Sequence, residues 1–103
     1  MEDAALRFVE HTEERVAIVC AKDAAVAWSS ATKDFGSRPR RRSRVGEWTE
    51  AHDFFAKGRV AARPQTVSAS AWIDDADDDA DLVEHVFAIP RLNMTMSLLW
   101  WKP

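Results

Sequence analysis

Three apolar segments near the end of the chain are joined by connections that allow only one kind of sheet. The segments span residues 66–73, 82–89 and 94–101, with eight and four residues between them. Parallel strands need a crossover of about a dozen residues or more, so segments this close together pair antiparallel. The spacing therefore predicts a three-stranded antiparallel meander, with residues 74–81 at a hairpin tip and Pro90 ending the middle strand.

The last of these segments carries two adjacent tryptophans. Side chains alternate along a strand, so Trp100 and Trp101 point to opposite faces and one indole should leave the core side. Exposed aromatic and Met side chains are enriched at interfaces, which makes Trp101 a candidate partner-binding residue. If this strand lies at a sheet edge, it predicts a homodimer through that C-terminal edge strand. The alternative is that helices cover both faces and bury both indoles.

The chain before the meander predicts two helices and a strand. Residues 2–13 combine early acids with a modest apolar face, which favours a helix. Residues 15–21 (RVAIVCA) are apolar on both alternating faces, as in an internal strand covered twice. Asp23 can cap a second helix over 23–35, with apolar residues at helical spacing and Gly36 at its C-terminal end.

A short third helix is predicted from Thr49, which suits an N-cap, to Lys57, with Gly58 as the stop. Trp48 lies just outside the cap, where an apolar residue often packs on the first turn. The predicted fold class is α+β. It is a two-layer fold with an N-terminal helix, one strand, a second helix, a short third helix and the C-terminal three-stranded antiparallel meander, in a single domain over 1–103.

Composition limits the class of protein. Hydrophobic residues make up 47% and charged residues 30% of the 103, a balance typical of globular domains. Cys20 is the only cysteine, so no intramolecular disulfide or Cys-x-x-Cys metal site can form. The longest apolar run, residues 16–21, is far shorter than the ~20 residues that cross a bilayer. With an acidic N-terminal segment in place of a basic signal, these features predict a soluble, cytoplasmic protein without membrane contact.

Two blocks of opposite charge interrupt an otherwise nearly neutral chain. Residues 38–44 hold five arginines and no acid, and residues 74–84 hold seven acids and no Lys or Arg. Like charges repel within a block, and a connecting loop does not need them. We therefore expect a basic loop over 37–47 and an acidic hairpin tip over 74–81 that contact a partner, or else each other.

The acidic tip is the first candidate site. Alternating aspartates suggest an EF-hand calcium loop, but from Asp75 the sixth position is Ala80 and the twelfth is Val86, where a Gly and a bidentate Glu are required. We therefore interpret the tip as a solvated turn or as a carboxylate array that mimics nucleic acid toward a basic protein surface. The predicted partner-binding residues are Asp74, Asp75, Asp77, Asp78, Asp79, Asp81 and Trp101.

The arginine block supports an alternative, nucleic-acid binding by phosphate contacts and aromatic stacking. Its residues would be Arg38, Arg40, Arg41, Arg42, Arg44 and Trp48. The string R-R-R-S also fits a basophilic kinase site, and RPRRRSR fits a nuclear-localisation signal. A third interpretation is that the arginines pair with the acidic tip.

Catalysis has little support. The histidines His11, His52 and His85 lie on separate predicted elements, and Cys20 suits a small core residue better than a thiolate. Only Glu50 and Asp53 share the helical spacing of metal ligands, and the three glycines form no phosphate loop. The sequence predicts a small non-catalytic interaction protein, a regulator or inhibitor without cofactor or metal, whose partner is another protein. Nucleic acid is the alternative partner, and a small enzyme using His52 or His85 is a distant third.

Overall fold

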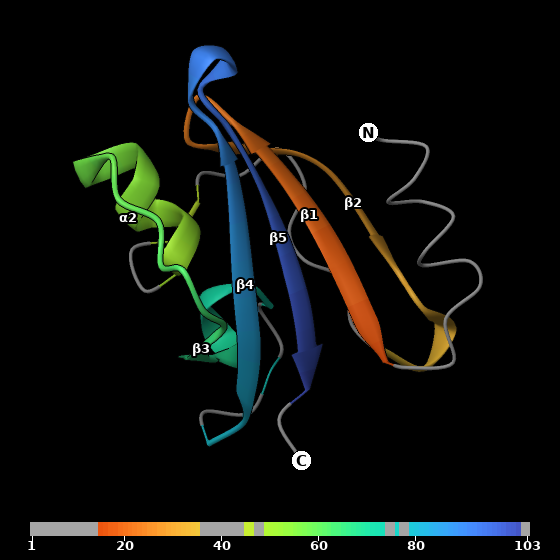
Figure 1. The fold of residues 1–103 in the computed structure, drawn as a ribbon. Coiled ribbons are helices and arrows are strands. Elements are labelled where there is room, and N and C mark those ends of the chain that lie inside the picture. The colour runs from red at the N-terminus through yellow and green to blue at the C-terminus, as the bar shows by residue number, and fades with distance from the viewer. Residues whose placement is uncertain (1–14, 36–44, 47–48, 74–75, 77–78, 102–103) are drawn as a thin grey trace.

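The structure, a computed structural model, describes residues 15–35, 45–46, 49–73, 76 and 79–101, and five strands form one antiparallel sheet within these ranges (Figure 1). The strand order is β2-β1-β5-β4-β3. The elements are β1 (Val16–Lys22), β2 (Ala25–Ala31), the 3-10 helix η1 (Lys33–Phe35), α2 (Glu50–Lys57), β3 (Gln65–Ser68), the 3-10 helix η2 (Ala69–Ala71), β4 (Asp81–Ile89), the 3-10 helix η3 (Pro90–Leu92) and β5 (Met94–Trp101).

The predicted two-layer α+β architecture is wrong. Most of the regular structure is the five-stranded sheet, and α2 is the one α-helix in the ranges given above. The last three strands do pair antiparallel in succession, but they continue into β1 and β2 and do not form a separate meander. The predicted helix over residues 2–13 lies outside the described residues.

The predicted helix over residues 23–35 is also wrong, because residues 25–31 form strand β2. Asp23 and Ala24 both have positive φ, 52° and 66°, and they connect β1 to β2 as a two-residue hairpin loop. A loop with two left-handed residues matches the twist of a hairpin, whereas an N-cap residue would be extended. As a strand, residues 25–31 form a ladder of main-chain hydrogen bonds to β1. The helical spacing of their apolar residues gave no sign of this pairing.

The strand predicted over residues 66–73 is shorter than expected. β3 ends at Ser68, and η2 then turns the chain so that Trp72 and Ile73 enter the core, where they are 3% and 1% exposed. The main-chain N–H of Ala69 donates to the carbonyl of Ala80, which closes this turn against the start of β4. Alternation in TVSASAWI therefore marks a strand only in its first half.

β5 is the middle strand of the sheet, so its predicted position at an edge is wrong. β1 pairs along one side of it and β4 along the other. The homodimer predicted through a C-terminal edge strand is therefore ruled out, because both edges of β5 are already paired. β1, predicted to be internal and covered on both faces, does lie between β2 and β5, and Val16 to Ala21 are all buried.

The short helix α2 is confirmed with both of its caps. The Thr49 hydroxyl accepts the main-chain N–H of His52, and Gly58 closes the C-terminal end with φ 69°. A left-handed residue at this position favours Gly, because no Cβ clashes there.

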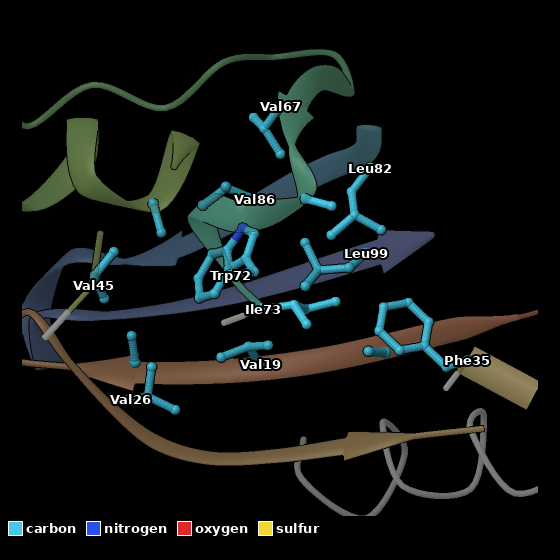
Figure 2. Close-up of a cluster of buried hydrophobic side chains, with 14 residues drawn as sticks. Val19, Val26, Phe35, Val45, Val67, Trp72, Ile73, Leu82, Val86 and Leu99 are labelled. Carbon is cyan, nitrogen blue, oxygen red and sulfur yellow. The ribbon is translucent and has the colours of Figure 1, made fainter. Parts of the chain in front are cut away.

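The main core lies between one face of the sheet and the segment that runs from α2 to Ile73. Figure 2 shows Trp72 and Ile73 pointing toward β1, β5 and β4, with Phe35 at one end and Val45 at the other. β2 and β3 form opposite edges of the sheet, and the described parts of the connection between them, including Phe35, Val45 and Ala51 of α2, contribute to this core. The core is made of Ala17, Val19, Ala21, Val26, Phe35, Val45, Ala51, Val67, Ala69, Trp72, Ile73, Leu82, Val86 and Leu99.

Candidate functional site

Glu84 is a fully buried acid at the centre of the molecule. It lies on β4, on the core face, and its side chain is 0% exposed. One carboxylate oxygen accepts the main-chain N–H of Glu50 at 2.8 Å and the indole N–H of Trp72 at 3.0 Å. The other accepts the main-chain N–H of Ala51 at 3.1 Å and the hydroxyl of Ser97 at 2.9 Å. The carboxylate therefore connects α2, β5 and the segment after η2.

Burial raises the pKa of the Glu84 carboxyl above its ordinary value of 4.5. Desolvation disfavours the charged form, while the four donors favour it and lower the pKa by a smaller amount. Three of the donors are N–H groups that cannot accept a hydrogen bond, and two of these belong to the first turn of α2, where the helix dipole favours an anion. The cluster is thus arranged around an ionised carboxylate.

This arrangement is structural in character. In the part of the chain that the structure describes, no group of three or more His, Cys, Asp and Glu residues could hold a metal ion. The partners of Glu84 are main-chain, indole and hydroxyl donors, and the Ser97 hydroxyl, the one nucleophile type among them, is 0% exposed, as is Glu84 itself. We interpret Glu84 as the polar anchor that holds α2 on the sheet.

The second face of the sheet, opposite the core, is also apolar. β1 and β5 contribute Val16, Ile18, Cys20 and Met96, all at most 9% exposed, to a separate buried cluster. The partly buried side chains packed against this cluster are Trp28, Met94, Leu98 and Trp100.

Exposure on the second face increases toward β4. The β4 residues on this face are Val83, His85, Phe87 and Ile89, which pair in register with Trp100, Leu98, Met96 and Met94 of β5. Phe87 is 53% exposed, and its ring centroid lies 4.4 Å from that of His85, which is half-buried. We call this part of the sheet the β4 patch, defined by these four β4 residues with Met94 and Leu98. No signal in the sequence identified this face of β4 as the more exposed one.

Charged residues mark the two ends of the β4 patch. Lys22 and Arg91 are exposed near the hairpin that joins β4 to β5, where Lys22 pairs with Met94. Asp81 is exposed at the opposite end of β4, in register with Ser68. Strand alternation places Lys22 and Asp81 on the same face as Phe87. A partner lying along this strand would therefore meet positive charge at one end and negative charge at the other.

Of the predicted acidic-tip residues, Asp79 and Asp81 are described, and both are exposed. Asp74, Asp75, Asp77 and Asp78 lie outside the described residues. The connection from β3 to β4 is longer than the predicted tip, because it includes η2.

Trp101 points to the core face, as alternation requires. Its indole N–H donates to the main-chain carbonyl of Phe35 at 2.8 Å, and the two rings lie 5.3 Å apart. The guanidinium of Arg15 lies 5.9 Å from the Trp101 ring. The side chain is half-buried. Trp101 therefore closes one end of the core, which leaves only part of its ring for the partner contact predicted from sequence.

The residues of the alternative sites are mostly not placed. The arginines of block 38–44 and Trp48 lie outside the described residues, so the nucleic-acid hypothesis stays a prediction. His52 is half-buried in α2, and His85 lies across the sheet on the second face. Because Glu84 points to the core face and His85 to the other, the structure does not bring the two together.

Comparison with known proteins gives no assignment: no family model matches the chain and no curated protein is similar to it. Within the described ranges, no helix has the length and apolar character needed to cross a membrane. Function must be inferred from the surface itself.

Proposed function

We propose that the protein is a small non-catalytic interaction module that binds another protein through the β4 patch. The observation that carries this proposal is the exposure of Phe87, which is 53% exposed in the middle of an otherwise buried or half-buried apolar sheet face. Contact between a large aromatic ring and water is unfavourable, so a partner that covers the ring lowers the free energy. Exposed aromatic side chains surrounded by partly buried apolar neighbours have the composition of interface hot spots.

The charges at the ends of the patch specify the kind of partner. Lys22 and Arg91 favour acidic residues at the hairpin end of β4, and Asp81 favours basic residues at the other end. Asp81 belongs to the acidic block 74–84, and Asp79 of the same block is exposed as well, which strengthens the preference for a basic group there. The partner we propose is a protein segment with an apolar centre, an acidic end and a basic end. This keeps the acidic tip as a contributor and replaces Trp101 by Phe87 as the aromatic contact.

A peptide-display experiment tests the proposal. A random peptide library is selected on the wild-type protein, and the affinities of enriched peptides are measured by fluorescence anisotropy for Phe87→Ser and for Leu92→Ser. Leu92 is a matched control, since it is 45% exposed but lies in η3 outside the strands. We expect enriched peptides to share an apolar centre with charged ends and to bind Phe87→Ser at least about tenfold more weakly, a change of roughly 1.4 kcal/mol.

The control variant should bind such peptides like the wild type. Both substitutions lie at exposed positions, so both variants should remain folded, which circular dichroism checks. Selection that enriches nothing, or peptides that bind Phe87→Ser as well as they bind the wild type, would contradict the proposal.

A further inference from the structure

Among the residues that the structure describes, no strand pairs with the outer edge of β2, and β2 itself carries little of the usual edge protection. β2 is the first strand in the sheet order, and within the described residues only β1 pairs with it. Its seven residues, AVAWSSA, contain no charge, no Pro and no Gly. Natural proteins usually protect such edges with charged residues, Pro, a bulge or a very short strand.

The opposite edge of the same sheet has these devices. β3 is only four residues long and follows Arg63 and Pro64, and η2 takes the chain out of the sheet directly after Ser68. In β2 the single protective feature is a bulge. The register with β1 shifts so that Cys20 pairs with Trp28 and Ala21 with Val26, which leaves Ala27 as the extra residue. Beyond the bulge, Trp28 to Ala31 form a regular and unprotected segment.

The register shows which main-chain groups of this segment face outward. The N–H of Thr32 donates to the carbonyl of Val16 at 2.9 Å, so position 32 faces β1. In an antiparallel pair the hydrogen-bonding positions alternate, so Ser30 faces β1 as well, while Ser29 and Ala31 direct their N–H and C=O groups away from it. Four main-chain groups are thus presented along one line.

We infer that this edge pairs with β2 of a second copy of the chain, antiparallel and across a two-fold axis at Ser30. In that register Ser29 lies opposite Ala31 of the second copy, and Ala31 opposite Ser29, so that the outward groups of both strands satisfy each other. Opposed residues point to the same face, as antiparallel pairing requires. The result is a continuous ten-stranded sheet with an isologous interface.

A second copy suits this edge better than an unrelated peptide. An isologous contact brings each charge near its own copy, which is repulsive, and the segment that would face itself here is uncharged and made of small side chains on either side of the axis. Trp28, which is half-buried, lies diagonal to Ser30 of the second copy and would be covered further. The inference does not rest on the proposed function, because it uses the β2 edge and not the β4 patch.

Cross-linking tests the register directly. Ser30 on the axis forms a non-hydrogen-bonded pair with its own copy, with Cα atoms about 4.5 Å apart, which is within the disulfide range of roughly 4.4–6.8 Å. Ser30→Cys should therefore form a disulfide-linked dimer under mild oxidation. The native Cys20 is 1% exposed and should not react. Lys57→Cys, at an exposed position on α2, is the matched control and should remain largely monomeric.

Sedimentation equilibrium tests the energetics with two further variants. Ser29→Pro removes an outward N–H and leaves the ladder to β1 intact, and Ser30→Lys brings two like charges together at the axis. Each should raise the dimer dissociation constant at least about tenfold. Thr66→Lys, the same kind of change on the exposed face of the β3 edge, should have no effect. If Ser29→Pro fails to fold by circular dichroism, Ser30→Lys still decides the question. A wild type that stays monomeric at high concentration, or a dimer unaffected by Ser30→Lys, overturns the inference.

Discussion

Replacing Glu84 tests whether its carboxylate holds α2 on the sheet. Glu84→Ala leaves three N–H donors and the Ser97 hydroxyl without their acceptor, all buried except the part-buried N–H of Glu50, together with a cavity. One hydrogen bond to a charged group contributes about 1.5–3 kcal/mol, but the four act as a unit, and removing one member of a buried charged network costs about 3–5 kcal/mol in total. A domain of this size is stable by about 5–15 kcal/mol, so the variant should lose a large share of its stability.

Glu84→Gln separates the charge from the hydrogen bonds. The amide oxygen can keep the donors from Glu50 and Trp72, and the Ser97 hydroxyl can rotate to accept from the amide nitrogen. Only the Ala51 N–H then loses its partner, and the burial of a charge is relieved, so we expect a loss of about 1–2 kcal/mol near neutral pH.

The pH dependence has a definite sign. Burial raises the pKa of Glu84 in the folded state above its ordinary value of 4.5, so in the interval between the two values the native state binds more protons than the unfolded state. The free energy of unfolding should therefore fall as pH rises from about 4.5 through the folded-state pKa. Glu50, whose pKa is also raised, first by burial and then by Asp53, adds a slope of the same sign. The difference between wild type and Glu84→Gln isolates the contribution of Glu84.

Urea denaturation followed by circular dichroism across this pH range measures all of these quantities. Glu50→Gln is the control, since Glu50 donates to Glu84 from its main chain and the substitution leaves that bond in place. The reasoning is refuted if Glu84→Ala costs less than about 1 kcal/mol, if the Ala and Gln variants are equally destabilised, or if Glu84→Gln has the same pH profile as the wild type.

Two smaller predictions follow from the backbone and from one buried hydroxyl. Ala24 has φ 66°, a conformation that costs a residue with a Cβ about 1–2 kcal/mol. Ala24→Gly relieves this strain but gives the unfolded chain more conformational entropy, so the free energy of unfolding should rise by about 0.5–1 kcal/mol. Ala25→Gly, inside β2, should lower it. The Thr95 hydroxyl is buried, and the described residues give it no hydrogen-bond partner. Thr95→Val should therefore stabilise the fold by roughly 1 kcal/mol. Ser97→Ala, which removes a donor to Glu84, should destabilise the fold by a similar amount. Thermal and urea unfolding of the four variants check both, and a destabilised Thr95→Val or Ala24→Gly would contradict them.

The sequence predicted the elements whose local signals are strong. The apolar run of β1, the Thr49 and Gly58 caps of α2 and the Pro90 end of β4 are each sufficient to place an element. Residues 23–35 were misassigned because Trp28, Ala31 and Phe35 fit helical spacing, while the two left-handed residues of the hairpin, Asp and Ala, carry no glycine signal. Pairing with β1 decides between the two, and pairing is not a local property.

The candidate site was harder to predict. No local signal showed which face of β4 is buried, because the preference of Phe for the interior would place Phe87, and not Glu84, in the core. A glutamate in a strand is expected to face solvent unless buried hydrogen-bond donors surround it. The donors to Glu84 come from α2, β5 and Trp72, all distant from it in the sequence. The acidic and basic blocks drew attention by charge, whereas Phe87 at the centre of the β4 patch and the outer edge of β2 are uncharged.

The position of β5 restricts how the protein can be made. β5 is encoded last among the strands, yet it joins the β1–β2 hairpin to β4 and β3, and these two halves pair with each other nowhere else in the sheet. A nascent chain that has emerged from the ribosome only as far as Asn93 therefore holds two half-sheets, each with an open side. Chaperones that bind exposed apolar strands should associate with the polypeptide until residues 94–101 have been released, and then dissociate as the sheet closes.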